Sequence, residues 1–400
     1  MKRKFFLIIF IVIIGLIFVR STRKTWTPEA AVGGGYEKIS IIGETTNKGV
    51  FDPAIEYNED GSVGWMVYSA LEQPPEKVNR PFPKYIHTHL AKTTDNGKTW
   101  KFVKRLTESK EDAVTIKNAI DPRIVRIAKI NGGKITGTWR HEVSTLVHDP
   151  DDPGKEWKLF WHKYFAVENP GGGKRINIPE YMWIMYKCAH TPEELDSAQA
   201  IKLFTSNIVL IPARYNLNDI PELKNSIYYS EPGSLYKDGV LYLALNAGRM
   251  NFDSHKQIIL YSSNHGKTWV YVNKLTDHND TISLSYPKDA RCVALLAPAL
   301  TQERGRVFLL SSAATSRGHR GTYIFEFEDI TKGILKRDKS GKLIVHKFLP
   351  PSIMLPKNNA GESDYDEYNT YGGIIMPQGD PSSFPKLGQI FNTKEKIVDN

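Results

Sequence analysis

The chain has 400 residues, of which 40% are hydrophobic and 24% charged, and its formal net charge is +9 at pH 7. This composition is that of a folded globular protein and excludes a disordered chain. Lysine and arginine are scattered rather than gathered in blocks, which favours a solvated basic surface over a nucleic-acid-binding tail. The two cysteines, Cys188 and Cys292, are too few to build the fold by disulfides, whether they form one bridge or stay free.

The N-terminus predicts export to a membrane. The basic stretch "MKRK" precedes residues 5–19, which are apolar and uncharged, and Arg20 follows directly. A basic region before an apolar run is the pattern of a secretory signal. We expect residues 1–24 to be an uncleaved signal anchor, with a cleaved signal peptide as the alternative, and the rest of the chain to lie outside the cytoplasm, in the periplasm or at the cell surface. Residues 25–49 are then a linker with a first or closing strand.

From residue 50 to residue 400 the sequence predicts an all-β domain built from repeats. A pattern recurs that starts with "FDPA", "IDPR", "SEPG" or "LAPA", in each of which a Pro follows a small or acidic residue. A polar turn and a second strand come after each start, and a degenerate copy lies near Tyr371. These copies start at residues 52, 121, 231, 297 and about 371. Repetition of a four-stranded unit at such spacing is typical of a β-propeller, and we count five blades.

Two similar stretches, "TTDNGKTW" at 93–100 and "SSNHGKTW" at 262–269, lie between predicted strands. Gly tolerates positive φ, Asp or Asn can bond to its own backbone, and Trp can fill a gap beside the next strand, so each stretch predicts a hairpin turn. We expect Asp95 to be structural. Both stretches resemble the Asp box of sialidases and other proteins with BNR repeats, which joins the third and fourth strands of a propeller blade.

Asp52, Asp121 and Glu231 hold the same place in the first three repeats, and Ala297 replaces the acid in the fourth. The first strands of all blades begin at one face of a propeller, so these three carboxyls are predicted to meet at its central mouth. Carboxyls held together raise one another's pKa values and suit acid–base chemistry. The simpler interpretation is that each acid–Pro pair is only a turn that enters a strand.

The order Asp, Asp, Glu resembles the five-bladed glycosidases of families 43 and 32, over about residues 50–330. The resemblance implies that Asp52 is the base or nucleophile, Asp121 the residue that modulates pKa, and Glu231 the general acid. One departure is the order Pro-Gly after Glu231, where family 43 usually has Gly-Pro. The implied activity is hydrolysis of a glycosidic bond in a glycan or polysaccharide by a membrane-tethered enzyme.

Further residues are predicted at the mouth because they end second strands or follow them. The candidates for substrate binding are Arg123, Trp139, Arg140, His141, Asn246, Arg249, Arg317, His319 and Tyr371, and Glu142 lies beside them. The segments 69–85 and 140–157 are predicted to be loops that wall a pocket, which favours attack at a chain end.

Two alternatives stay open. A six-bladed sialidase-like enzyme would fit the Asp-box resemblance, although "FDPA" stands where sialidases have Arg-Ile-Pro. A propeller that binds glycans without catalysis would also fit, because the fold alone does not decide function. We expect a monomer without a metal site, cofactor or nucleic-acid partner, with room for a structural cation in the central channel.

Overall fold

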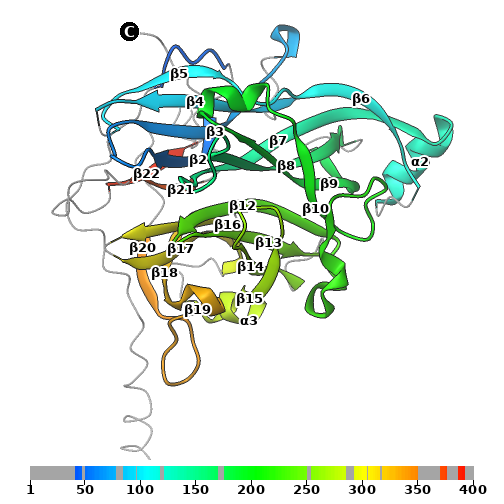
Figure 1. Cartoon of the computed structure of the whole chain (residues 1–400). Coiled ribbons are helices and arrows are strands. Elements are labelled where there is room, and N and C mark those ends of the chain that lie inside the picture. The colour runs from blue at the N-terminus through cyan, green and yellow to red at the C-terminus, as the bar shows by residue number, and fades with distance from the viewer. Residues whose placement is uncertain are drawn as a thin grey trace, which may run out of the picture.

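The structure is a computed structural model that describes residues 41–349, 370–375 and 386–391, apart from gaps at 47–49, 78–83, 96, 118–120, 170–174, 250–253, 285–291, 304 and 316–317. The predicted all-β architecture is confirmed, because these residues form four sheets of four to six strands and one strand pair (Figure 1).

Each sheet has its strands mainly in antiparallel order. The first contains β1 (Ile41–Ile42), β2 (Val50–Tyr57), β3 (Gly64–Glu72), β4 (Tyr85–Thr93) and β5 (Trp100–Arg105). The second contains β6 (Lys110–Thr115), β7 (Lys134–His148), β8 (Trp157–Val167), β9 (Ile176–Ala189), β10 (Ile201–Thr205) and β11 (Tyr215–Asn216). The third contains β12 (Tyr228–Lys237), β13 (Val240–Gly248), β14 (Lys256–Ser262) and β15 (Val270–Thr276). The fourth contains β16 (Cys292–Glu303), β17 (Arg306–Thr315), β18 (Gly318–Asp329), β19 (Ile334–Leu335) and β20 (Val345–Leu349), and β21 (Thr370–Ile375) pairs with β22 (Lys386–Phe391).

The helices are short. They are α2 (Pro122–Ile130), α3 (His278–Ser283) and the 3₁₀ turns η1 (Pro75–Lys77), η2 (Pro192–Asp196), η3 (Leu217–Asp219), η4 (Pro221–Leu223) and η6 (Ile330–Lys332).

The inner strands of the four sheets contact one another in order, β2 with β7, β7 with β12 and β12 with β16. The pair β21–β22 contacts β2 on one side, and β21 contacts β16, β17 and β18 on the other (Figure 1). The arrangement is a propeller in which four blades are described. The predicted count of five is not confirmed, since the pair β21–β22 is what the structure describes of the last repeat.

One backbone feature recurs in all four inner strands. Asp52, Val143, Glu231 and Ala297 each have φ between +46° and +54°, where residues other than Gly are strained. Each begins a bulge at which the pairing with the second strand shifts register. Bulges bend a strand and re-aim its side chains. We call these four residues the kink residues.

The third blade approaches the fourth closely just after its kink. A Cβ on Gly233 would lie 2.0 Å from the carbonyl oxygen of Pro298, so only Gly fits there. This contact explains the Gly in "SEPG", and it fixes β12 against β16 within a residue or two of two kinks.

The two similar stretches form turns between third and fourth strands, β4–β5 and β14–β15. The Asp95 carboxylate accepts hydrogen bonds from the Thr99 amide (2.9 Å) and from the hydroxyls of Thr93 (2.8 Å) and Thr99 (2.7 Å), which hold its pKa at about 2. Trp100 is fully buried. Thr93, where the turn begins, pairs with Gly64 at one end of β3. Phe51, which precedes the kink at Asp52, pairs with Ser69 near the other end of β3, so the turn and the kink lie at opposite ends of the sheet.

Two sequence predictions about organisation are wrong. Asp121 does not begin an inner strand, because Pro122–Ile130 is helix α2, and the inner strand of the second blade is the later part of β7. Residues 140–148 are therefore strand rather than a loop that walls a pocket. The extra length between 121 and 231 enlarges the second sheet to six strands and adds no blade.

The predicted membrane segment, residues 5–19, lies outside the described residues. Within the described part of the chain, no helix is both long and apolar enough to span a membrane. Cys188 is a free thiol.

Candidate functional site

Three carboxyl groups from three consecutive blades interact electrostatically. Asp52 and Glu231 are kink residues, and Glu142 stands immediately before the kink at Val143. The negative charge of Glu142 raises the pKa of both Asp52 and Glu231, and that of Glu231 raises the pKa of Asp52. We call Asp52, Glu142 and Glu231 the carboxyl trio.

Asp52 is the most deeply placed member, with a relative exposure of 4%. Its Oδ2 accepts a hydrogen bond from the Ser69 hydroxyl (3.2 Å), which in turn accepts one from the Val143 amide of the next blade (3.0 Å). Its Oδ1 is buried with no partner among the described residues. Burial, followed by the charges of Glu142 and Glu231, raises the pKa of Asp52 well above its usual value.

Glu231 is half-buried, and both of its hydrogen bonds go to the same oxygen. Oε2 accepts from the Ala297 amide of the next blade (2.6 Å) and from Nδ2 of Asn246. Burial raises the pKa of Glu231 to about 7, the charge of Glu142 adds to the rise, and the two N–H donors oppose it. Near neutral pH this carboxyl is therefore able to hold and to release a proton.

Glu142 is half-buried and is the member with a cation beside it. Burial raises its pKa, while the charge of Arg140 and a hydrogen bond from Tyr164 oppose that rise. The Arg140 guanidinium is fixed by donating through Nε and Nη2 to the carbonyl oxygen of Lys84, both at 3.3 Å. Glu142 is thus the member that its surroundings favour most as an anion.

The structure places Asp121 and Arg123 elsewhere. Asp121 is the N-cap of α2, where its carboxylate accepts from the Arg123 amide (2.9 Å) and pairs with the Arg123 guanidinium (2.7 Å). Helix α2 lies at the far end of β6 and β7 from β2 (Figure 1). The prediction that these two residues line the mouth is wrong, because the Asp-Pro pair starts a helix here.

Trp139 does not offer a free face for stacking. It is 9% exposed and packs among Phe165, Tyr181 and Trp183, and its Nε1 donates to Asp112 (2.9 Å). The prediction that it stacks on a sugar is therefore wrong, since its neighbours are core residues.

His141 is also buried, and its Nδ1 accepts a hydrogen bond from Nε1 of Trp161 (2.9 Å). Burial lowers its pKa well below the usual value, so its ring is neutral. It lines a cavity of about 360 Å³ between the first two sheets, together with Arg105, Lys163 and Lys187, and no member of the carboxyl trio lines that cavity.

Asn246 is fully buried and contacts Glu231, so it positions a trio member rather than touching a substrate. Arg249 is exposed at the end of β13, where its amide donates to the Ser254 hydroxyl (3.0 Å). The remaining candidates lie outside the described side chains: Arg317 falls in a gap, and His319 and Tyr371 are described as backbone of β18 and β21.

Sequence reasoning placed Glu142 near the mouth but left it out of the trio. The signal for it is spacing. The kinks at 52, 143, 231 and 297 are 91, 88 and 66 residues apart. A series through residue 121 has the less regular intervals of 69, 110 and 66 residues. The second blade lacks the Pro that marks the other three kinks, and it carries its acid one residue earlier.

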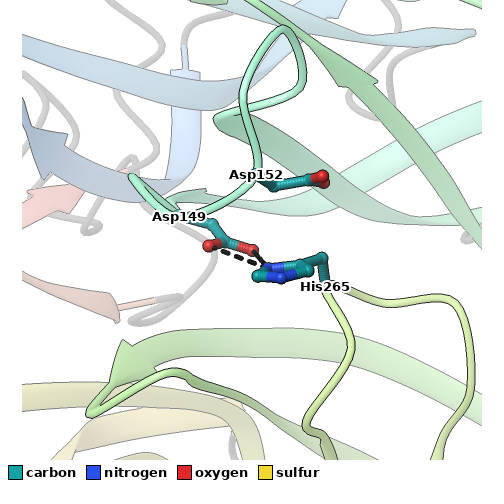
Figure 2. Close-up of side chains that lie close together, drawn as sticks. All are labelled: Asp149, Asp152 and His265. Atoms are coloured by element: carbon teal, nitrogen blue, oxygen red, sulfur yellow. Dashed lines mark hydrogen bonds and ion pairs between the residues drawn. The ribbon is translucent and has the colours of Figure 1, made fainter.

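One cluster of acidic and histidine side chains has the residue types of a metal site. It lies on the loop after β7 and in the β14–β15 turn. Asp149, Asp152 and His265 bring their ligand atoms within 4.8 Å of one another (Figure 2). The fully buried ammonium of Lys158 already lies 2.9 Å from a carboxylate oxygen of both Asp149 and Asp152. His265 Nδ1 bonds to Asp149 (3.1 Å) and so ties the third blade to the second. Lys158 supplies the positive charge that a metal ion would bring, and the cluster is structural.

The carboxyl trio can be set beside known proteins. The chain matches no known protein family and no curated protein. Solved structures with a related propeller include a Hadza microbial sialidase (13% identity, 78% of this chain and 52% of that chain, TM-score 0.40). A second is the GH32 β-fructofuranosidase of Bombyx mori, with 12% identity over 76% of this chain and 51% of that chain and a TM-score of 0.40. A third is a thermostable family-43 glycoside hydrolase, with 10% identity over 84% of this chain and 82% of that chain and a TM-score of 0.37.

All three of these neighbours are named as glycosidases, and this chain spans about half the length of the first two. At these identities and TM-scores the likeness carries no argument about activity, and the chemistry of this chain has to be argued from its own residues.

The raised pKa of Glu231 predicts a pH-dependent stability difference for Glu231→Gln. The pKa is about 7 in the folded protein against 4.5 for a free side chain. The folded state therefore binds this proton more tightly, and its stability from this group is present below pH 4.5 and is lost as the pH rises to about 7. Relative to the native protein, the variant should gain about 2–3 kcal/mol in unfolding free energy over that range. Urea unfolding at several pH values measures the gain, and a difference that stays flat would contradict the environment described for Glu231.

The role of Lys158 predicts that its loss is costly and that chelators have no effect. Lys158→Met leaves the buried Asp149 carboxylate without its cation, which should lower the unfolding free energy by about 3–5 kcal/mol. The control Lys332→Met removes an ammonium that is 71% exposed from Asp329, and it should cost less than about 1 kcal/mol. EDTA should leave the melting temperature of the native protein unchanged. A drop in that temperature would mean that a metal, not Lys158, balances the cluster.

Proposed function

We propose that this protein is a glycoside hydrolase that cleaves a glycosidic bond of a glycan with the carboxyl trio. The observation that carries the proposal is that Asp52, Glu142 and Glu231 lie at or beside the equivalent kink of three inner strands that contact one another. The raised pKa values of Asp52 and Glu231 support it. Burying three interacting carboxyls is costly, and acid–base catalysis is the chemistry that uses such an arrangement. The family-43 and family-32 resemblance of "FDPA" and "SEPG" supports the same class.

Glu231 is the general acid in this proposal, and Asp52 in its ionised form is the base or nucleophile. Burial, followed by the charges of Glu142 and Glu231, raises the pKa of Asp52, which makes that ionised form a stronger base. Glu231 gives its proton to the leaving oxygen as the bond between that oxygen and the anomeric carbon breaks. Asp52 either takes a proton from the water that attacks the anomeric carbon or attacks that carbon itself before water releases the sugar. In both cases one water is consumed. On the first route Asp52 ends protonated and Glu231 ionised, and exchange of a proton with solvent at each group restores the starting state. On the second route Glu231, ionised after the first step, takes the proton of the water that releases the sugar and is restored directly.

Glu142 takes the modulating role that the resemblance implied for Asp121. Its charge raises the pKa of the other two members, and Arg140 helps to keep it ionised. A fixed negative charge beside Glu231 favours the protonated form of that acid near neutral pH. In this proposal the modulator lies on the inner strand of the second blade, beside a kink like the other two members.

The remaining parts of the proposal rest on sequence. Export and membrane tethering rest on the apolar run at 5–19, and attack at chain ends rests on the Pro-rich segment 69–85 alone, since 140–148 is a strand. A monomer without cofactor stays our prediction, as does room for a cation in the central channel. The sialidase alternative loses support, because Arg123 is paired with Asp121 and the segment 121–231 adds no blade.

Glycan binding without catalysis is a second candidate that one observation favours. Asp52 and Glu231 each have one carboxyl oxygen in hydrogen bonds with the protein, as expected for structural acids. The other oxygen of each accepts no hydrogen bond from the described residues, so one oxygen on both groups is not tied to the protein there. The two candidates differ in turnover.

The direct test is hydrolysis of a panel of aryl glycosides and polysaccharides by the full chain. Asp52→Asn and Glu231→Gln should each lower the rate on the substrate that is cleaved by 10²–10⁴-fold, the usual worth of a positioned acid or base. The matched control is Asp121→Asn, which keeps an N-cap side chain on α2 and should retain the native rate. Activity that survives both trio substitutions would reject the proposal, and glycan binding without turnover in the native protein would support the second candidate.

The modulating role of Glu142 predicts a shifted pH profile. Glu142→Gln removes a negative charge that raises the pKa of Glu231, so the acid should lose its proton at a lower pH. The basic limb of the rate profile should move down by about one pH unit. Asp121→Asn should leave the limb in place. An unshifted limb in Glu142→Gln, or a shifted one in Asp121→Asn, would return the modulating role to the residue that the sequence first suggested.

A further inference from the structure

A chain of buried hydrogen bonds crosses the third blade at the level of Glu231. Ser230, Asn246, Gln257 and Thr276 are aligned by strand pairing across β12, β13, β14 and β15. Asn246 Nδ2 donates to Glu231 Oε2, Gln257 Nε2 donates to Asn246 Oδ1 (3.4 Å), and the Thr276 hydroxyl donates to Gln257 Oε1 (3.3 Å). Asn246 and Gln257 are both fully buried.

The far end of this chain reaches the fourth blade. The Ser311 hydroxyl of β17 donates to Gln257 Oε1 at 2.8 Å, and Ser311 is itself fully buried. Thr276 and Ser311 both donate to the Gln257 carbonyl oxygen, and the amide N–H₂ of Gln257 faces Asn246. Asn246 then presents its own N–H₂ to Glu231. The chain therefore has one direction, from the hydroxyls towards the carboxyl.

A second donor fixes that direction at the carboxyl itself. The Ala297 amide also bonds to Glu231 Oε2 (2.6 Å), and a backbone N–H can only donate. A proton on Oε2 would face two N–H groups, while Oε1 accepts no hydrogen bond from the described residues. We propose that Asn246 and Gln257 act as a one-way relay that keeps Oε2 of Glu231 an acceptor and directs its proton to Oε1.

This inference rests on the proposed function for its catalytic meaning, since Oε1–H is then the proton given to the leaving oxygen. Asn246 and Gln257 are positioning residues, because they act through Glu231. The titratable groups that face Glu231 among the described residues are Glu142 on β7, Asp52 on β2 and Tyr228 on β12. None of these groups belongs to the relay, so a change in the relay can be measured against a constant charge background.

The relay is tested by infrared difference spectroscopy of the full chain during a pH titration. Glu231→Gln identifies the C=O band of protonated Glu231, because that band is absent from the variant. In Asn246→Leu the carbonyl oxygen Oε2 loses one donor, so the band should move to higher frequency. The titration midpoint of Glu231 should also rise by about one to two pH units, the usual effect of removing a hydrogen bond to a carboxylate. Thr322→Val on β18 is the control, because the buried Thr322 hydroxyl has no hydrogen-bond partner among the described residues, and it should leave both unchanged.

A milder variant keeps the test usable if the fully buried Asn246 cannot be replaced. Thr276→Val is isosteric and removes one of the two donors to Gln257 Oε1, so it should shift the band and the midpoint in the same direction by a smaller amount. An unmoved C=O band in Asn246→Leu or Thr276→Val would overturn the relay, since it would mean that Oε1 is the carbonyl oxygen. The spectrum needs no substrate. Failure of the relay therefore shows in the band, and failure of the proposed function shows in the absence of turnover.

Discussion

The structure depends on a strained backbone kink that is repeated in each inner strand. A residue other than Gly at positive φ costs about 1–3 kcal/mol, and four of them lie at equivalent places in four blades. The kink begins a bulge, and the bulge turns the side chain and amide of its first residue away from the normal alternation of the strand. Both groups are used here, the side chain for Asp52 and Glu231, and the amide for bonds to a neighbouring blade.

Burial and mutual repulsion then set the chemistry of the trio. Each carboxyl is held where ionisation is disfavoured, and each has a different compensation: a hydroxyl for Asp52, an arginine for Glu142, and two N–H donors for Glu231. Such groups do not titrate independently, and the protons belong to the set. The members differ in which carboxyl oxygen can be protonated without the loss of a hydrogen bond. The donors that the protein holds beside each oxygen decide this.

The sequence was sufficient to predict the all-β propeller and two of the three carboxyls. Acid–Pro at the start of a strand marks a bulge in "FDPA" and "SEPG", because Pro suits a position where a ladder hydrogen bond is missing. The same pair misleads at Asp121, since Asp is also a good N-cap and Pro a good first residue of a helix. Ile124 and Ala128, the buried face of α2, carried the helical spacing that would have separated the two cases.

Glu142, Gln257 and the Ala297 amide could not be predicted in the same way. Glu142 has no Pro beside it, Gln257 is one polar residue in an apolar strand, and an amide leaves no mark in the sequence. Their roles follow from register, which brings Gln257 level with Asn246, and from the contact between neighbouring blades. The sequence specified which residues were available, and the pairing of strands determined which of them met.

The fourth blade shows why the kink is more general than the acid. Ala297 has no charge to offer, yet it keeps the strained backbone and the following Pro. Its amide is the donor to Glu231 of the third blade, just as the Val143 amide reaches Asp52 of the first blade through Ser69. The kinks at Val143 and Ala297 thus each supply a donor to the blade before them. The strain at Ala297, a position without a carboxyl, is explained by the hydrogen bond that its amide gives to the neighbouring blade, so the kink belongs to the repeat whether or not it carries an acid.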